Sequence, residues 1–222
     1  MQDKEKTDLS RQFTEFHNQG KYYKNLPKVF VIGHNKTATK AIDNTFKLSN
    51  YRAVHWAKGR LAGIIFLNLK SNLPLLTHID DYHCYSDMEM VGEFYAYELF
   101  PLFDLQYPGS LFVYNKRNTE DWIKSRLNHL DYTEQYQARF NSKNFKKLTT
   151  IDEVKQHWKD FHARHERRVL KYFEQKNNLI QLDIESLQSQ RDFIQRLSKE
   201  GFKINDSLKT LPIVGAGQTI IK

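Results

Sequence analysis

Short apolar runs alternate with longer amphipathic stretches along this chain. Most of the apolar runs are rich in β-branched and aromatic residues and stop at glycine, polar or charged residues, a pattern typical of buried strands. We expect strands at 29–32, 51–56, 82–85, 110–115 and 178–183. The stretches between them carry helical spacing or helix boundary signals and predict helices over 8–20, 41–46, 61–69, 94–105, 119–130, 150–173 and 189–200.

The order of these elements predicts an α/β fold. Strands that alternate with helices form a parallel sheet with helices on both faces, so we expect three layers around about five parallel strands. No linker, repeat or low-complexity segment divides the 222 residues, which indicates one domain over 1–222 with a peripheral helix at 7–20 and a peripheral tail at 203–222. The polar stretch 132–148 is expected to be a connection, and the glycine loop 214–219 has no assigned role.

The segment after the first strand has the features of an anion-binding loop. Gly33 stops the strand, a small polar turn follows, and a helix begins near Lys40. Free N–H groups and the positive end of the helix dipole then face the loop, where Lys36, Lys40 and two threonine hydroxyls can meet one anion. The Walker pattern does not fit, because Ala38 and Thr39 stand where glycine and lysine would be. The alternative is a connecting loop that binds nothing.

A second basic position lies at the end of the strand 110–115. Arg117 follows this strand, and Ser125 lies two turns into the next helix, where a hydroxyl can share an anion with the guanidinium. Ligands of open α/β sheets bind outside the carboxyl ends of the strands, so Arg117 and the Lys36 loop are expected to face one crevice. A salt bridge for Arg117 and an ordinary polar helix face for Ser125 remain the structural alternatives.

Composition narrows the class of protein. The 34 lysines and arginines exceed the 26 acidic residues, giving a formal net charge of +8 that suits an anionic ligand, nucleic acid or simple solubility. A single cysteine, Cys84, excludes an internal disulfide, and no apolar run is long enough for a bilayer or a signal peptide. We therefore expect a cytoplasmic protein without stable membrane insertion. His162 and His165 lack an acidic zinc partner pattern, so no metal site is expected.

These residues resemble the sulfotransferases that use 3′-phosphoadenosine-5′-phosphosulfate (PAPS). The family carries a Lys-Thr/Ser-Gly-Thr-Thr loop after its first strand, to which Lys36-Thr37-Ala38-Thr39-Lys40 is similar, with Ala38 and Lys40 as departures. It also carries an arginine at a later strand end and a serine eight residues on, which Arg117 and Ser125 match. The resemblance covers about residues 28–200 and implies a P-loop NTPase-like sulfotransferase fold. The usual C-terminal Arg-Lys-Gly segment is not visible.

The resemblance implies roles for individual residues. Sulfuryl transfer builds negative charge on the departing phosphate oxygen, which Lys36 is expected to stabilise without a metal. Asp87 is ranked slightly ahead of His55 as the base, with a turn aspartate and a core histidine as alternatives. The expected PAPS-binding residues are Asn35, Lys36, Thr37, Ala38, Thr39 and Lys40 in the loop, together with Arg117 and Ser125.

The acceptor and the partners are less defined by the sequence. A hydroxyl on a carbohydrate or small molecule is expected by analogy, and Trp56, Tyr85 and Tyr95 are candidate lining residues that the core explains as well. The alternative functions are a P-loop-type kinase, which would require magnesium and ATP, and a basic nucleic-acid-binding module. No reading motif supports the latter, so no nucleic-acid partner is expected. The oligomeric state stays open.

Overall fold

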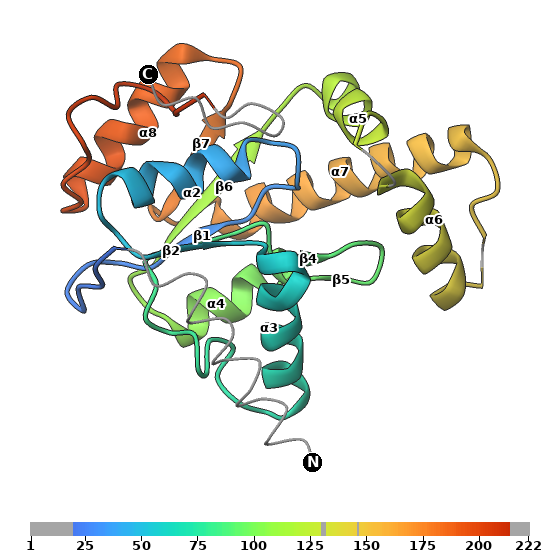
Figure 1. Cartoon of the computed structure of the whole chain (residues 1–222), viewed down its shortest axis with the longest axis horizontal. Coiled ribbons are helices and arrows are strands. Elements are labelled where there is room, and N and C mark those ends of the chain that lie inside the picture. Colours follow the sequence, from blue (N-terminus) through green and yellow to red (C-terminus); the bar gives the residue numbers. More distant parts are fainter. Residues whose placement is uncertain (1–19, 130–131, 146, 214–222) are drawn as a thin grey trace.

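A single parallel sheet lies at the centre of the molecule. The computed structural model describes residues 20–129, 132–145 and 147–213. Its strands are β1 (Val29–Val31), β2 (Ala53–His55), β3 (Cys84–Ser86), β6 (Leu111–Lys116) and β7 (Leu179–Asp183), in the order β2-β3-β1-β6-β7 (Figure 1). All neighbouring strands are parallel. The predicted α/β fold with five parallel strands is confirmed.

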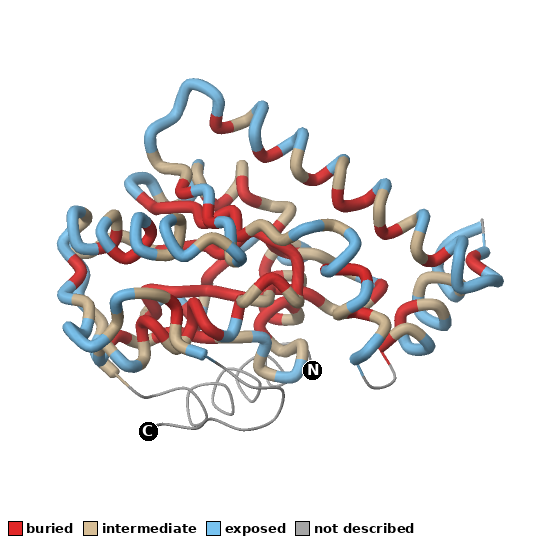
Figure 2. Tube along the Cα trace, turned by 90° about the horizontal axis from the view of Figure 1, so that it is seen from above, coloured by how far each residue is buried: buried red, intermediate tan, exposed pale blue. Residues whose placement is uncertain are grey.

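Alternation along β1 divides the core between two faces of the sheet. Val29 and Val31 pack with α2 (Thr39–Leu48) and α8 (Leu187–Lys199). Phe30 and Ile32 lie in the opposite cluster, with α3 (Arg60–Lys70), α4 (Phe100–Gln106) and the C-terminal half of α7 (Ile151–Phe173). The buried positions therefore run through the middle layer, with exposed positions on the outer turns of the helices (Figure 2).

A third apolar cluster lies beyond the sheet. The helix α7 extends past the strands, and its N-terminal half packs against α5 (Thr119–Leu127) and α6 (Tyr132–Lys143) (Figure 1). Trp122, Tyr136 and Trp158 are the large residues that fill this cluster. The predicted capping box that opens α7 is present, since Thr150 accepts a hydrogen bond from the Glu153 N–H and the Glu153 side chain accepts from the Thr150 N–H.

Two predicted segments differ in the structure. The helix expected over 94–105 begins only at Phe100, and residues 94–95 form β5 (Phe94–Tyr95), which pairs antiparallel with β4 (Glu89–Met90) before a 3₁₀ turn, η2 (Ala96–Leu99). Pro101 lies in the first turn of α4, where proline is tolerated. A helix that began at residue 94 would place this proline in its interior, where it would break the backbone hydrogen bonds. The stretch 132–148, expected to be a connection, contains α6, whose Tyr132 and Tyr136 lie one turn apart and are buried.

The segments at the two ends are only partly described. The helix expected at 7–20 and the glycine loop at 214–219 lie outside the described residues, Gly20 apart. Residues 203–211 run along α2 and α8, where the Lys203 N–H donates to the Tyr51 hydroxyl at 2.7 Å and Leu211 is buried. Within the described ranges, no helix has the length and apolarity needed to cross a membrane.

Candidate functional site

The loop after β1 is held closely against the neighbouring strand β6. The Gly33 N–H donates to Oδ1 of Asn115 at 2.9 Å. A Cβ atom at position 33 would lie 2.3 Å from both the carbonyl oxygen and Oδ1 of Asn115, a distance that no side chain tolerates. Glycine is required here because two backbones approach each other, in addition to its role in ending the strand.

The same asparagine and one tryptophan hold the rest of the loop. Nδ2 of Asn115 donates to the carbonyl oxygen and to Oγ1 of Thr37, each at 2.6 Å, and the Thr37 hydroxyl donates to the His34 carbonyl. The indole N–H of Trp122, on α5, donates to the Asn35 carbonyl at 2.9 Å. The side chain of Thr37 thus turns into the protein, so this residue can offer a ligand its backbone N–H group rather than its hydroxyl.

The loop conformation directs the start of α2 toward solvent. Lys36 and Ala38 have positive φ angles of 63° and 62°, so the backbone turns twice through the left-handed region. Ala38 precedes α2, and within the described residues no side chain caps its first turn. The first N–H groups of a ten-residue helix and the exposed Lys40 therefore surround the mouth of the loop, with Lys36 half-buried beside them. This is an arrangement suited to a phosphate or sulfate group.

The segment that carries Arg117 and Ser125 starts at the same edge of the sheet. The strands β1 and β6 are adjacent and parallel, with Val31 paired to Val113, so the segments that follow them leave on one side. Nε of Arg117 lies 3.3 Å from Oε1 of Glu185, and this contact leaves the outer nitrogens of the guanidinium without a hydrogen-bond partner among the described residues. The side chain of Asn118 caps α5, the helix on which Ser125 lies half-buried.

Electrostatics link the two basic positions. The pKa of Lys36 is lowered mainly by burial and also by the positive charge of Arg117, while Asp87 opposes this shift. The pKa of Lys36 therefore responds to the charges of both Arg117 and Asp87. Asp87, Lys36 and Arg117 follow three neighbouring parallel strands, β3, β1 and β6, at the same edge of the sheet.

The two candidate bases form a pair. Nδ1 of His55 lies 3.1 Å from the Ser86 hydroxyl, and Nε2 of His55 lies 3.5 Å from Oδ2 of Asp87. Burial raises the pKa of Asp87 well above its usual range, and the neighbouring carboxylate of Glu89 raises it further. Asp87 also has a positive φ of 53°, which is uncommon outside glycine and asparagine. A carboxyl group with a raised pKa is a stronger base once ionised.

Asn115 and Trp122 are parts of the site that sequence reasoning missed. Both lie within the segment that carries Arg117 and Ser125, and both contact the loop 33–37. A signal for Asn115 was present, since it is the polar residue that ends an otherwise apolar strand. Trp122 gave no such signal, because an apolar helix position is explained by core packing.

Most of the chain matches a known protein family. The family model described as "Sulfotransferase domain" matches residues 28–199, which include every strand of the sheet and all the candidate residues. The chain belongs to the sulfotransferase family. No curated protein matches this sulfotransferase. The resemblance inferred from the loop and the Arg117 motif is confirmed, and so is the sulfotransferase fold.

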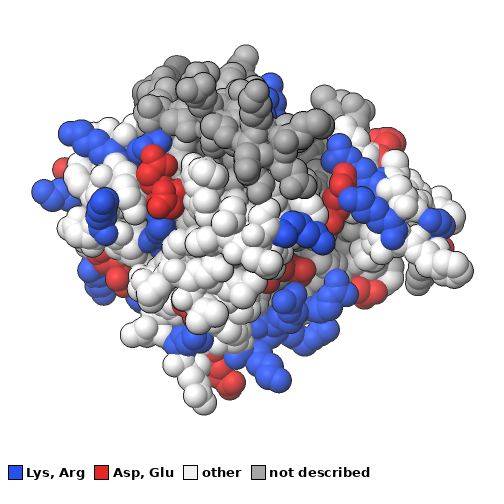
Figure 3. All heavy atoms as spheres, turned by 90° about the horizontal axis from the view of Figure 1, so that it is seen from below, with Lys and Arg blue, Asp and Glu red and all other residues white. Residues whose placement is uncertain are grey.

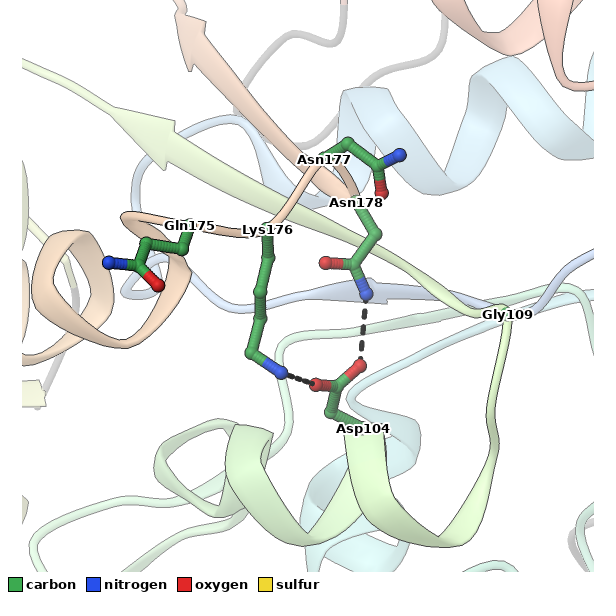
Figure 4. Close-up of a pocket in the computed structure, with 6 residues that line it drawn as sticks. All are labelled: Asp104, Gly109, Gln175, Lys176, Asn177 and Asn178. Carbon is green, nitrogen blue, oxygen red and sulfur yellow. Dashed lines mark hydrogen bonds and ion pairs between the residues drawn. The ribbon is translucent and has the colours of Figure 1, made fainter.

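Other parts of this sulfotransferase are less suited to its chemistry. A polar pocket lined by Asp104, Gly109, Gln175, Lys176, Asn177 and Asn178 is shown in Figure 4. These residues precede or begin β6 and β7, so the pocket lies at the edge of the sheet opposite to Lys36. Its carboxylate is already occupied, because Asp104 accepts hydrogen bonds from Lys176, Asn178 and Tyr172. In the described ranges, no group of three or more His, Cys, Asp or Glu residues is placed to hold a metal.

Proposed function

We propose that this sulfotransferase moves the sulfuryl group of PAPS to a hydroxyl acceptor. Two basic positions at one edge of the sheet support this proposal: the loop that contains Lys36, and Arg117 with Ser125. The N–H groups at the start of α2, with Asn35 to Lys40, would hold the 5′-phosphosulfate. Arg117 and Ser125 would hold the 3′-phosphate, which ATP lacks. The parallel pairing of β1 with β6, which makes both basic segments leave the sheet at one edge, is the observation that carries the assignment.

The chemistry follows from the charges around the crevice. The acceptor oxygen attacks sulfur in line with the bond to the 5′-phosphate, and that bond breaks with its electrons on the phosphate oxygen. Lys36 would stabilise this departing oxygen as its charge grows. Asp87 would take the proton from the acceptor hydroxyl, and His55, 3.5 Å away, would orient the carboxylate. This reaction needs no metal ion.

The rim of the crevice favours an acceptor with a flat or ring-shaped body. Trp56 directly follows His55 and is 42% exposed, whereas Tyr85 is fully buried. Tyr95 is partly buried. An exposed indole next to His55 can stack on a sugar ring or an aromatic alcohol, so we propose a carbohydrate or small-molecule acceptor. The single buried cysteine suits a reducing compartment, so we propose the cytoplasm as its location.

Nucleotide affinity tests the proposal. Isothermal titration calorimetry should detect binding of adenosine 3′,5′-bisphosphate without magnesium, and Arg117→Ala should weaken it about tenfold to hundredfold while changing AMP affinity little. Arg191→Ala is the matched control, since Arg191 is an exposed arginine on α8. Magnesium-dependent binding that favours ATP would instead support a kinase, and an equal loss for AMP and the bisphosphate would remove Arg117 from the 3′-phosphate site.

A further inference from the structure

A fully buried arginine lies behind the candidate active site. Arg126 is 0% exposed and belongs to α5, directly after Ser125. Four aromatic rings surround its guanidinium, with the centroids of Trp122, Trp158, Tyr132 and Tyr136 at 4.5, 4.6, 4.9 and 5.6 Å. These rings stabilise the cation through their faces, but a charge removed from water also requires an anion nearby.

Glu89 supplies that anion. Its residue is 1% exposed, and its Oε1 accepts a hydrogen bond from the Tyr132 hydroxyl at 3.1 Å. The same hydroxyl accepts a hydrogen bond from Nη2 of Arg126, so one tyrosine oxygen bridges the two charges. Oε2 of Glu89 and the Nε and Nη1 atoms of Arg126 have no hydrogen-bond partner in the described part of the chain. Arg126 and Glu89 are thus held together by the bridging Tyr132 hydroxyl and by the attraction of their opposite charges.

The carboxylate of Glu89 lies two residues from Asp87, at the start of β4. The charged and titratable groups that act on Asp87 are Glu89, Arg126 and Lys36, with His55 at 3.5 Å. Glu89 in turn is influenced by Arg126 and Tyr132, and its charge also reaches Tyr95 and Tyr97. Two carboxyl groups only two residues apart, Glu89 buried and Asp87 partly buried, resist ionising together.

We propose that Glu89 is a positioning residue for Asp87, held in place by Arg126 through the Tyr132 hydroxyl. The negative charge of Glu89 makes Asp87 bind a proton more strongly. A base that takes a proton from an alcohol needs this property. The aromatic rings around Arg126 keep water away from the Arg126–Glu89 pair. Water would screen the charge of Glu89 and weaken its effect on Asp87. The role in catalysis rests on the proposed function, whereas the coupling between the two carboxyl groups does not.

Carbon-13 NMR of labelled aspartate and glutamate carboxyl groups tests the coupling directly. The Asp87 signal is assigned by its loss in Asp87→Asn, and its titration midpoint is compared between the wild-type protein and Glu89→Gln. The midpoint should move to lower pH in Glu89→Gln, because a neighbouring negative charge is removed. Glu93→Gln is the matched control: Glu93 pairs with Lys143 and Arg139 and should leave the midpoint unchanged.

The outcomes separate this inference from the proposed function. An unchanged Asp87 midpoint in folded Glu89→Gln overturns the inference, whatever the protein binds. If Glu89→Gln does not fold, Tyr132→Phe removes only the bridging hydroxyl. This variant should raise the titration midpoint of Glu89 and lower that of Asp87. An unchanged Asp87 midpoint in Tyr132→Phe would also overturn the inference. Calorimetry with adenosine 3′,5′-bisphosphate should give an affinity within about twofold of the wild-type value in both variants. A larger loss of affinity would show that the substitution disturbs nucleotide binding, which bears on the proposed function and not on the coupling of the two carboxyl groups.

Discussion

The side-chain amide of Asn115 donates to two oxygens of Thr37, its carbonyl and its hydroxyl, each at 2.6 Å. The acceptor atom of the same amide receives the Gly33 N–H, so one side chain from β6 binds both ends of the loop after β1. The strand that leads to Arg117 therefore also shapes the loop that presents Lys36. The two proposed phosphate sites are mechanically connected through this residue.

Asn115→Asp should disrupt the loop with almost no change of volume. The variant keeps an acceptor for Gly33 but places a buried carboxylate against the Thr37 carbonyl, so we expect the free energy of unfolding to fall by about 2–4 kcal/mol. The affinity for adenosine 3′,5′-bisphosphate should fall about tenfold by calorimetry. Asn177→Asp, at an exposed position, is the control and should change neither quantity. Wild-type affinity in Asn115→Asp would show that the loop does not depend on this amide.

Ala38→Gly should stabilise the protein. Ala38 has a φ of 62°, a conformation that costs an alanine about 1–2 kcal/mol and glycine almost nothing. After the extra flexibility of glycine in the unfolded chain is subtracted, a gain of about 0.5–1 kcal/mol remains, measurable by urea unfolding. Ala41→Gly, at the third residue of α2, should instead destabilise by about 1 kcal/mol. Loss of stability in Ala38→Gly would contradict the left-handed conformation of the loop.

Asp87→Asn should lower the activity of the protein and raise its stability. The folded protein binds the Asp87 proton more tightly than the unfolded chain, because burial and Glu89 raise the folded pKa. Ionisation therefore lowers stability as the pH rises from the unfolded pKa through the folded pKa. Asparagine removes this loss and adopts positive φ readily, so the free energy of unfolding at pH 7 should rise by about 1 kcal/mol while sulfuryl transfer slows about 100-fold or more. Asp206→Asn, exposed near the end of the described chain, should affect neither property.

His83 should make the fold sensitive to mild acid. Its Nε2 accepts the Tyr23 N–H at 2.9 Å, so Nδ1 carries the proton that points to the Pro27 carbonyl at 3.3 Å. Burial lowers the pKa of His83 to about 4. The unfolded chain then binds the proton first, and stability is lost as the pH falls from the unfolded value of 6.5 toward 4.

His83→Gln separates this effect from general acid denaturation. Glutamine can accept the Tyr23 N–H and donate to Pro27 without titrating, so the free energy of unfolding should change less between pH 7 and pH 5 than in the wild-type protein. His78→Gln is the control, because residue 78 is exposed. Identical pH dependence in wild-type and His83→Gln proteins would place the acid sensitivity elsewhere.

The sequence predicted the strands well because buried parallel strands carry a strong local signal. The runs at β1 and at the start of β6 are continuous and apolar, and β7 alternates buried with exposed residues. The ends of β1 and β6 place Lys36 and Arg117 at one edge once the strands are parallel. The helix α6 was missed because its two buried tyrosines are diluted by polar residues, and only packing against Trp158 reveals their face. Glu89 and Arg126 were missed for a similar reason: nothing local distinguishes a charge that is buried from one that is solvated.

Lysine and arginine side chains lie in several groups on the face shown in Figure 3, with acidic side chains among them. The order of the strands has a further consequence, since β1 has β3 on one side and β6 on the other. In the proposed function, the groups for the donor follow β1 and β6, and the groups for the alcohol lie at the ends of β2 and β3. The proposed function therefore lets substitutions on the β2 and β3 side change the acceptor, while the residues proposed to bind the donor stay the same.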